Sequence, residues 1–347
     1  MISARGLAAH DAGADLVPWD FERREVGPGD VQIAISHSGV CHSDIHLVRG
    51  DWGDQEFPVV PGHEIVGEVV AVGSDVTDFS VGDRAGVGVY VDSCRECANC
   101  LAGQSNYCLE GMTGTYANPD RRHGGYTQGG YSTTIVVDHG YVVHVPESLD
   151  PAGAAPLLCA GITLYAPLRR FEAGPGKRVG IVGLGGLGHM GVKFAVAMGA
   201  DVTVISHSPE KKADAEKLGA QRFLLSTDQD AMDAERYGFD LIINTVSVPL
   251  DTNVYLELLG FQGVFVNVGL PGEPFSFDAP RILNQGRSIV GSMIGPVSQL
   301  QEMLDFSAKH GIHSEVEVIP ADYINDAYRR VIDSDVRYRF VIDGSTI

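Results

Sequence analysis

The sequence has few lysines and no long apolar stretch. Its 25 basic residues include six lysines and face 45 acidic residues, so the formal charge is −20 at pH 7. A field of that sign repels phosphate, and we therefore expect no nucleic-acid partner. No run approaches the roughly 20 apolar residues of a membrane helix, so we expect no membrane partner either. The arginine bias fits a salt-tolerant host or a GC-rich genome equally well.

The N-terminal residues Met1–Leu7 lack a charged segment leading into an apolar core. We therefore expect no secretory signal and predict a cytoplasmic protein. In such a reducing compartment, the six cysteines are more typical of metal ligands or reactive thiols than of disulfides. The length of 347 residues and the hydrophobic content of 44% allow two domains with ordinary cores.

Four cysteines lie close together in the sequence, as Cys94, Cys97, Cys100 and Cys108. Thiols at this spacing can converge on one tetrahedral zinc ion, which holds a small lobe together in place of a buried core. A pair of local disulfides is the competing interpretation, and the reducing compartment disfavours it. Because four thiolates leave no open position for a substrate, the spacing predicts a structural zinc site.

Two further candidate ligands, Cys41 and His63, lie near the two ends of the segment that joins two predicted strands, residues 30–35 and 65–72. A thiolate and an imidazole presented from two loops of one sheet are plausible zinc ligands. Taken singly, such a cysteine or histidine is more often packed and inert. His63 does not begin a helical zincin motif, because residue 67 is glycine.

The N-terminal part of the chain has the pattern of short β-strands separated by Gly, Asp and Pro. Strands are expected at residues 30–35, 65–72, 84–90, 133–137 and 141–146. They predict an antiparallel, partly barrel-like domain. Residues 111–131 are rich in Gly, Tyr and Thr and contain Arg121-Arg122-His123. We expect this segment to be a surface excursion and assign no separate function to it.

From Lys177 to Val290 the pattern changes to alternating strands and helices, which predicts a doubly wound parallel sheet. The strands are expected at residues 179–182, 202–206, 222–225, 240–243 and 263–268, and the helices near 188–198, 210–218, 229–236 and 253–259. After Gly295 the pattern returns to that of the N-terminal part of the chain. Helices are expected at 297–308 and 324–332 and strands at 316–319 and 338–342. The chain is therefore expected to re-enter its N-terminal domain.

The first crossover of this region contains a glycine-rich turn that suits a dinucleotide. Such a turn allows close backbone approach and offers the N–H groups of a helix N-terminus to a pyrophosphate. Glycine-rich turns between a strand and a helix also occur for packing reasons alone. The residues expected to bind the cofactor here are Gly183, Gly185, Gly186, Leu187 and Gly188.

The end of the second strand of this region bears on the choice of cofactor. An NAD-binding protein should carry Asp or Glu there, to accept a hydrogen bond from the ribose 2′-OH. This chain instead has Ser206, His207, Ser208 and, two residues later, Glu210 and Lys211. Hydroxyls, an imidazole and an ammonium group can bind a 2′-phosphate, so the pattern favours NADP(H). Lys211 could instead simply lie in the first turn of a helix.

Taken together, the chain resembles the zinc-containing medium-chain alcohol dehydrogenases, and within them the cinnamyl-alcohol-dehydrogenase-like, NADP-dependent aldehyde reductases. The resemblance runs nearly end to end. It implies a GroES-like, mostly antiparallel β catalytic domain with a structural zinc lobe at residues 1–156, a Rossmann domain at 157–295 and a return to the catalytic domain at 296–347. The motifs that carry it are Gly39–Asp44, Pro61–Glu64, the four-cysteine lobe, Ala155–Thr163, Gly183–Met190, Gly291–Gly295 and Arg337–Asp343.

The resemblance also implies roles for individual residues. Cys41, His63 and Cys159 would hold a catalytic zinc, which Glu64 can approach, and Asp44 would orient the histidine. A proton would pass through Ser43 and His46; without the neighbouring Cys41, a loop hydroxyl and a surface imidazole would be the plainer interpretations. The further cofactor contacts implied are His42 and Arg337 at the pyrophosphate and Thr163, Val268 and Ile294 beside the nicotinamide. The implied substrate pocket contains Trp52, Tyr90 and Ile294, although the two aromatic residues could instead be ordinary core residues.

The function implied is hydride transfer between NADP(H) and an aromatic or medium-chain aldehyde or primary alcohol, with two zinc ions per chain. A homodimer or homotetramer is expected. Two alternatives remain open. One is an NAD-dependent polyol or formaldehyde dehydrogenase, and the other is a non-catalytic relative that binds zinc and a nucleotide.

Overall fold

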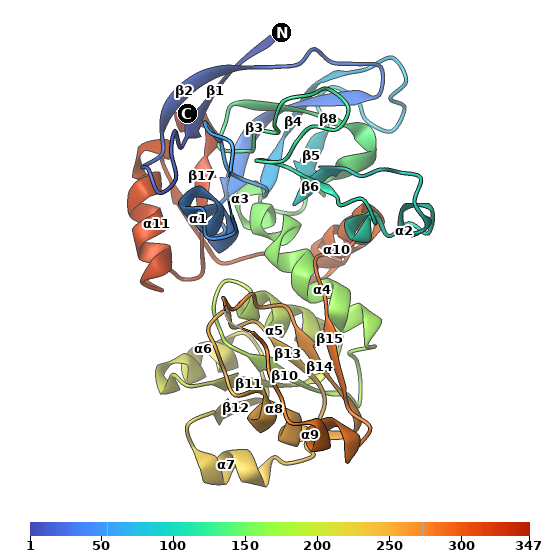
Figure 1. Cartoon of the computed structure of the whole chain (residues 1–347), viewed down its shortest axis with the longest axis vertical. Helices are drawn as coiled ribbons and strands as arrows, with labels where there is room; N and C mark the ends of the chain where they lie inside the picture. Colours follow the sequence, from blue (N-terminus) through green and yellow to red (C-terminus); the bar gives the residue numbers. More distant parts are fainter. Residues whose placement is uncertain (54, 273) are drawn as a thin grey trace. The chain divides into compact units, whose positions relative to one another are not determined.

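The computed structural model describes residues 1–53, 55–272 and 274–347, which form two compact units. Unit 1 comprises Met1–Ile162 and Gly295–Ile347, and unit 2 comprises Thr163–Ile294. In Figure 1, unit 1 accordingly contains both the blue and the red ends of the chain. The chain leaves unit 1 once and returns to it.

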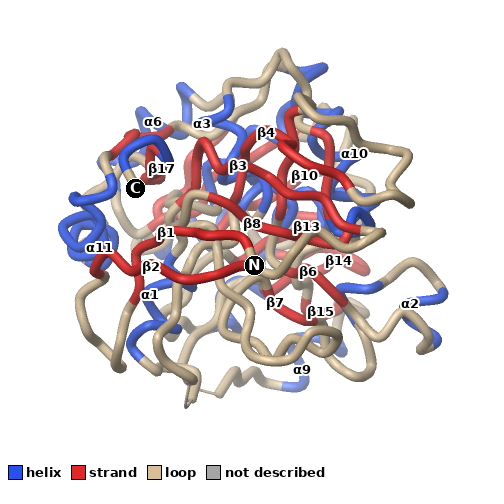
Figure 2. Tube along the Cα trace, turned by 90° about the horizontal axis from the view of Figure 1, so that it is seen from above, coloured by secondary structure: helices blue, strands red, loops and turns tan. Residues whose placement is uncertain are grey.

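Strand β3 (Asp30–Gly39) is the centre of the main sheet of unit 1. One of its edges pairs with β4 (Ile65–Val72). The other edge pairs first with β8 (Thr134–Asp138) and then, near its end, with β17 (Arg339–Asp343). All three pairings are antiparallel, and Figure 2 shows β3, β4 and β8 side by side. Segments from three distant parts of the sequence therefore meet on one strand.

The rest of this sheet extends on both sides, in the order β16-β17-β3-β4-β5-β9. The outer strands are β5 (Arg84–Val87), β9 (Val142–His144) and β16 (Val316–Ile319). Strands β16 and β17 run parallel, although the sequence pattern predicted an antiparallel domain. The reason is the helix α11 (Ile324–Ile332) between them, because a helical crossover returns the chain in the same direction.

Two features near the N-terminal half differ from expectation. An antiparallel hairpin of β1 (Ile2–Ala8) and β2 (Val17–Arg23) precedes the first expected strand. The expected strand at 84–90 is split into β5 and β6 (Tyr90–Asp92), and β6 pairs with β7 (Thr113–Gly114). The break falls at Gly88, where an added Cβ would lie 2.9 Å from the carbonyl oxygen of Leu158. Close backbone approach thus ends the strand there.

Cys41 begins a helix, whereas the sequence analysis placed it in a loop. It is the N-cap of α1 (His42–Arg49), and the helix ends at Gly50 in the left-handed conformation. The carboxylate of Asp44 accepts a hydrogen bond from the Cys41 N–H at 2.8 Å, which satisfies a backbone donor at the helix start. The other helices of unit 1 are α2 (Ala98–Leu101), α3 (Pro151–Ala154), α10 (Val297–His310) and α11, and α4 (Ala160–Arg170) runs from unit 1 into unit 2.

Unit 2 is built on a six-stranded, all-parallel sheet in the order β12-β11-β10-β13-β14-β15. Its strands are β10 (Arg178–Val182), β11 (Asp201–Ser206), β12 (Arg222–Leu225), β13 (Phe239–Asn244), β14 (Leu259–Asn267) and β15 (Ser288–Gly291). Its helices are α5 (Gly188–Ala197), α6 (Lys212–Lys217), α7 (Gln229–Ala234), α8 (Thr252–Leu258) and α9 (Ala279–Leu283).

Helices cover both faces of this sheet. On one face, Met232 of α7 and Leu256 of α8 share a buried cluster with Phe265 of β14. On the other face, α5 lies close to the sheet at Gly191, where an added Cβ would lie 3.3 Å from the side chain of Ile181. The predicted doubly wound sheet is therefore confirmed.

Within the described residues, no single helix has the length and apolar character needed to cross a membrane. One bent pair, Pro151–Leu158 and Ala160–Arg170, meets the criteria of length and composition only.

Two phenylalanines of β14 offer a matched test of this packing. Phe265 is fully buried, whereas Phe261 is 76% exposed. We expect Phe265→Ala to lower the free energy of unfolding by about 3–5 kcal/mol, because it removes a ring and leaves a cavity. Phe261→Ala should change it by less than about 0.5 kcal/mol. Chemical denaturation of both variants measures the difference, and equal losses would contradict the assigned burial.

Candidate metal and nucleotide sites

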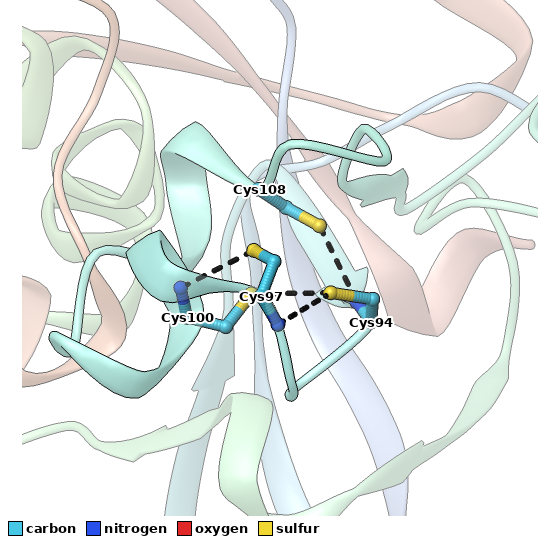
Figure 3. Close-up of side chains that lie close together, drawn as sticks. All are labelled: Cys94, Cys97, Cys100 and Cys108. Atoms are coloured by element: carbon cyan, nitrogen blue, oxygen red, sulfur yellow. Dashed lines mark hydrogen bonds between the residues drawn. The ribbon is translucent and has the colours of Figure 1, made fainter.

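The four clustered cysteines converge in a small lobe of unit 1. Their sulfur atoms all lie within 4.8 Å of one another, and Cys94 Sγ and Cys100 Sγ are 3.8 Å apart. Figure 3 shows the four side chains pointing toward a common centre. Ligands about 2.3 Å from a tetrahedral zinc ion lie about 3.8 Å apart, so the arrangement fits such an ion.

The backbone of the lobe stabilises thiolates. The Sγ of Cys97 accepts hydrogen bonds from the N–H of Leu109 at 3.4 Å and of Cys100 at 3.5 Å. These N–H groups lower the pKa of Cys97 to about 6. The start of α2 and the turn at residue 109 thus stabilise the thiolate form of Cys97, which is the form that binds a cation.

A second cluster of possible ligands is buried at the heart of unit 1. Cys41, His63, Glu64 and Cys159 each offer an atom within 4.8 Å of the others. They come from the start of α1, from the turn before β4, and from the break between the 3-10 helix Ala155–Leu158 and α4. The structure therefore brings together the four residues that the resemblance implied for the catalytic zinc.

The buried groups of this cluster shift one another's pKa values. Hydrogen bonds from Cys159 and His63 lower the pKa of Cys41 well below the ordinary value of a thiol. Burial disfavours a charged His63, yet the neighbouring Asp44 and Cys41 raise its pKa above the usual range. A thiolate and an imidazole are ligands that zinc binds, and His63 would release its extra proton when the ion binds.

Asp44 orients the histidine. Its Oδ1 lies 3.0 Å from Nδ1 of His63, and its carboxylate is fully buried. A proton on Nδ1 therefore points to the carboxylate and leaves Nε2 as the ligand atom. The position of Asp44 agrees with the orienting role that the resemblance implied.

Glu64 has a buried partner that the sequence analysis missed. Arg339 of β17 donates hydrogen bonds to Glu64 Oε1 and to the carbonyl oxygen of Val40. Burial raises the pKa of Glu64 to about 7, although Arg339 opposes the shift. Its other oxygen, Oε2, is buried and has no hydrogen-bond partner among the described residues. An arginine inside the apolar run of residues 338–342 was the available signal.

The two proposed proton carriers lie on α1. The Oγ of Ser43 is 3.6 Å from Cys41 Sγ. Nδ1 of His46 lies 2.8 Å from a carboxylate oxygen of Asp51, a residue that the sequence analysis also missed. The rings of His42 and Trp52 stack on the His46 ring, with centroids 4.9 and 5.3 Å away. This stack limits rotation of the His46 ring, and Trp52 itself is 48% exposed.

The glycine turn lies where β10 ends and α5 begins. Gly183 has a φ of +89°, in the left-handed region, and an added Cβ at Gly188 would lie 2.1 Å from the Gly183 carbonyl oxygen. Gly185 is different, because its added Cβ would have nothing within 4 Å. Packing explains Gly183 and Gly188, and it leaves Gly185 open for approach by a ligand.

The residues expected to bind the 2′-phosphate begin at Ser206, the last residue of β11, which is the neighbour of β10 in the sheet. The N–H of Gly183 donates to the carbonyl oxygen of Ile205 at 2.9 Å, so the two strand ends are adjacent. Ser206 is buried, and its Oγ accepts a hydrogen bond from the Ser208 N–H at 3.2 Å. Lys211 ends a 3-10 helix that precedes α6, so the expected helix starts later than predicted. His207 is exposed.

The remaining candidates are placed as follows. Thr163 and Ile294 are buried, and Val268 is partly buried, with its N–H bonded to the Asn244 carbonyl. Arg337 is exposed on the segment before β17. Tyr90 is buried, and its hydroxyl lies 2.8 Å from Ser105 Oγ. That packing supports the interpretation of Tyr90 as a core aromatic, and its role in a substrate pocket stays a prediction.

Comparison with known proteins identifies the family. Residues 27–147 match the alcohol dehydrogenase GroES-like domain, and residues 186–309 match the zinc-binding dehydrogenase family. The chain is 53% identical over 348 residues to the NADP-dependent alcohol dehydrogenase C 1 of Mycolicibacterium smegmatis, covering 100% of this chain and 99% of that protein. The chain belongs to the zinc-binding alcohol dehydrogenases.

Two solved structures of this dehydrogenase family agree. A cinnamyl alcohol dehydrogenase from Sorghum bicolor superimposes with a TM-score of 0.96 at 47% identity, over 99% of this chain and 98% of that one. A cinnamyl alcohol dehydrogenase from Helicobacter pylori, solved with NADP(H), gives a TM-score of 0.91 at 38% identity, over 99% of both chains. The predicted dehydrogenase family and its cinnamyl-alcohol-dehydrogenase-like branch are confirmed.

Two glycine variants test the assignment of the turn. Gly188→Ala forces a Cβ into backbone and should lower the free energy of unfolding by about 1–3 kcal/mol. Gly185→Ala meets open space and should change it by less than about 0.5 kcal/mol. Thermal melts without nucleotide measure both values. A loss in Gly185→Ala as large as in Gly188→Ala would show that Gly185 serves packing.

Proposed function

We propose that this chain is an NADP(H)-dependent alcohol dehydrogenase that reduces aromatic or medium-chain aldehydes to primary alcohols, with the reverse reaction also available. The observation that carries the proposal is the pair of unlike cysteine sites in unit 1. One site has four sulfur atoms, and the other has Cys41, His63 and Cys159 with a carboxylate alongside. Four thiolates close a zinc site, whereas three protein ligands leave a position for a substrate oxygen.

The residues of the second site fit a catalytic zinc ion. Cys41, His63 and Cys159 supply two sulfur atoms and one nitrogen, and the Oε2 atom of Glu64 is buried without a partner in the described parts of the chain. These residues would hold the ion, which would supply Lewis-acid chemistry toward a carbonyl or hydroxyl oxygen. Arg339 holds the other oxygen of Glu64, so this carboxylate stays beside the metal position.

Ser43, His46 and Asp51 supply a route for the proton. Ser43 lies next to the Cys41 sulfur, and His46 sits one turn further along α1. Asp51 accepts from the Nδ1 side of His46, which leaves the other ring nitrogen to exchange a proton. The ring of Trp52 stacks on the His46 ring and is half exposed, and we propose that it borders the substrate pocket together with Tyr90 and Ile294.

Unit 2 binds the nucleotide in this proposal. The open position at Gly185 and the N-terminus of α5 suit a pyrophosphate, with His42 and Arg337 as further candidates. Ser206, His207, Ser208 and Lys211 suit a 2′-phosphate, since no carboxylate ends β11. We assign zinc chemistry to residues 1–156 and 296–347 and nucleotide binding to 157–295, with Thr163, Val268 and Ile294 beside the nicotinamide.

We further propose a cytoplasmic homodimer or homotetramer. Six free cysteines suit a reducing compartment. Large apolar side chains are exposed in the segments beside β14 and β15, at one end of the sheet of unit 2. They are Leu270, Phe275, Phe277, Leu283 and Met293. A solution mass near the 37.0 kDa of one chain would contradict the oligomer, and cell fractionation tests the location.

Metal analysis combined with NADPH oxidation over an aldehyde panel tests the activity. We expect two zinc ions per chain and turnover of benzaldehyde-type substrates. Cys159→Ala should lower the zinc content to one ion per chain and abolish turnover, because the open site loses a ligand, while NADPH binding measured by fluorescence persists. Turnover by Cys159→Ala would refute the zinc assignment. Two zinc ions and bound NADPH without turnover of any aldehyde would favour a non-catalytic relative.

Replacing Ser206 tests the choice of cofactor. Ser206→Asp places a carboxylate at the end of β11, where it repels a 2′-phosphate and can accept from a 2′-OH. We expect the ratio of kcat/KM for NADPH over NADH to fall at least about tenfold. Ser288→Asp, the same change at the exposed start of β15, is the control and should leave the ratio unchanged. An NADH preference in the unaltered chain would favour the NAD-dependent alternative.

A further inference from the structure

The segment of residues 111–131, to which the sequence pattern gave no function, supplies two tyrosines to the buried cluster around Asp44. Tyr131 is fully buried, and its hydroxyl donates a hydrogen bond to Asp44 Oδ2 at 2.8 Å. Tyr116 is buried as well, and its ring lies on the ring of His63, with centroids 5.7 Å apart and planes inclined by 20°. Tyr131 therefore contacts Asp44, and Tyr116 contacts His63.

The backbone around Tyr131 is joined to the turn that carries His63. The N–H of Tyr131 donates to the Pro61 carbonyl at 2.9 Å, and the N–H of Gly130 donates to the Gly62 carbonyl at 2.8 Å. The ring packs so closely that an added Cβ at Gly62 would lie 2.5 Å from it. These contacts fix Tyr131 against the segment that carries His63. They limit movement of the Tyr131 hydroxyl away from Asp44.

Both oxygens of Asp44 face hydrogen-bond donors, and the Tyr116 hydroxyl also hydrogen-bonds to this carboxylate. Oδ1 faces His63 Nδ1 at 3.0 Å and the Gly62 N–H at 3.3 Å, and Oδ2 accepts from the Cys41 N–H and Tyr131 at 2.8 Å each. A buried carboxylate with donors on both oxygens cannot rotate freely. Removing the Tyr131 hydroxyl takes away one of the two donors that lie 2.8 Å from Oδ2.

We propose that Tyr131 is a positioning residue for the catalytic metal, which acts through Asp44 to hold His63 in the orientation that presents Nε2. Tyr116 supports the same orientation by covering one face of the His63 ring. The proposal rests on the proposed function, because it requires a metal ion at Cys41, His63 and Cys159. It assigns a role to residues 111–131, a segment that takes no part in the four-thiol lobe or in the proton route.

Zinc release from the holoenzyme tests the proposal. Tyr131→Phe removes one oxygen atom and should speed the loss of one of the two zinc ions to a chelating dye by about tenfold, the lower end for partners of a metal-binding histidine. The four-thiolate zinc should leave at the unaltered rate, which shows that the variant is folded. Tyr255→Phe, which changes a tyrosine of α8 in unit 2, is the matched control and should release both ions as the unaltered chain does.

A double-mutant cycle separates positioning from a general loss of packing. If Tyr131 acts through Asp44, then Tyr131→Phe should have little further effect on zinc release in an Asp44→Asn background. The visible spectrum of the cobalt-substituted open site should also change in Tyr131→Phe and not in Tyr255→Phe.

Release at the control's rate, or equal effects of Tyr131→Phe in both backgrounds, would overturn the proposal. If Tyr131→Phe also loses the four-thiolate zinc, Tyr116→Leu decides, because it uncovers His63 and keeps the Tyr131 hydroxyl on Asp44, although it removes the Tyr116 hydroxyl that also bonds to this carboxylate. Faster loss of the open-site ion in Tyr116→Leu supports the proposal, and an unaltered rate overturns it. An unaltered chain that binds a single zinc ion would instead show that the proposed function is wrong.

Discussion

The centre of unit 1 depends on the hydrogen bonds made by the buried side chain of Asp44. This side chain starts helix α1 through the N–H of Cys41 and faces the ring of His63. It also accepts from the hydroxyl of Tyr131. Burying a carboxylate raises the free energy of the fold unless each oxygen accepts hydrogen bonds. The segments that supply these donors are therefore expected to fold together. The helix start, the turn before β4 and the end of the 111–131 segment are thereby held in one arrangement.

The two cysteine clusters of unit 1 are built by different means, and this explains their different chemistry. The four-thiol lobe is local: its ligands lie within one short stretch, and its own backbone N–H groups surround the sulfur atoms. The second cluster joins Cys41, His63 and Cys159 through the sheet and its flanking helices. A local lobe can close around an ion without the rest of the fold. A site assembled from distant elements can keep one side open and surround it with oriented groups, such as the Glu64 and Arg339 pair.

Unit 2 illustrates how packing and binding divide the work of one glycine turn. Gly188 is required by the approach of the turn to itself, and Gly183 by its positive φ and by the nearby side chains of Thr245 and Val246. Gly185 has no such neighbour, and at that position the absence of a side chain leaves room for a ligand to approach the backbone. The adjacency of β10 and β11 then brings Ser206 beside the turn, because parallel neighbours end at the same edge of a sheet.

The amino-acid sequence by itself determined the features whose partners are close along the chain. Cysteine spacing predicted the four-thiol lobe, and alternating periodicity predicted the parallel sheet and its glycine turn, because both signals lie within short windows. The hairpin β1–β2, the helix start at Cys41, the buried partners Arg339 and Tyr131 and the exposed partner Asp51 were not predicted from the sequence. Arg339 and Tyr131 reach their partners across 275 and 87 residues, and no local pattern records such a pairing. Only the tertiary structure, in which β3 gathers β4, β8 and β17 on its edges, decided which charges and hydroxyls meet.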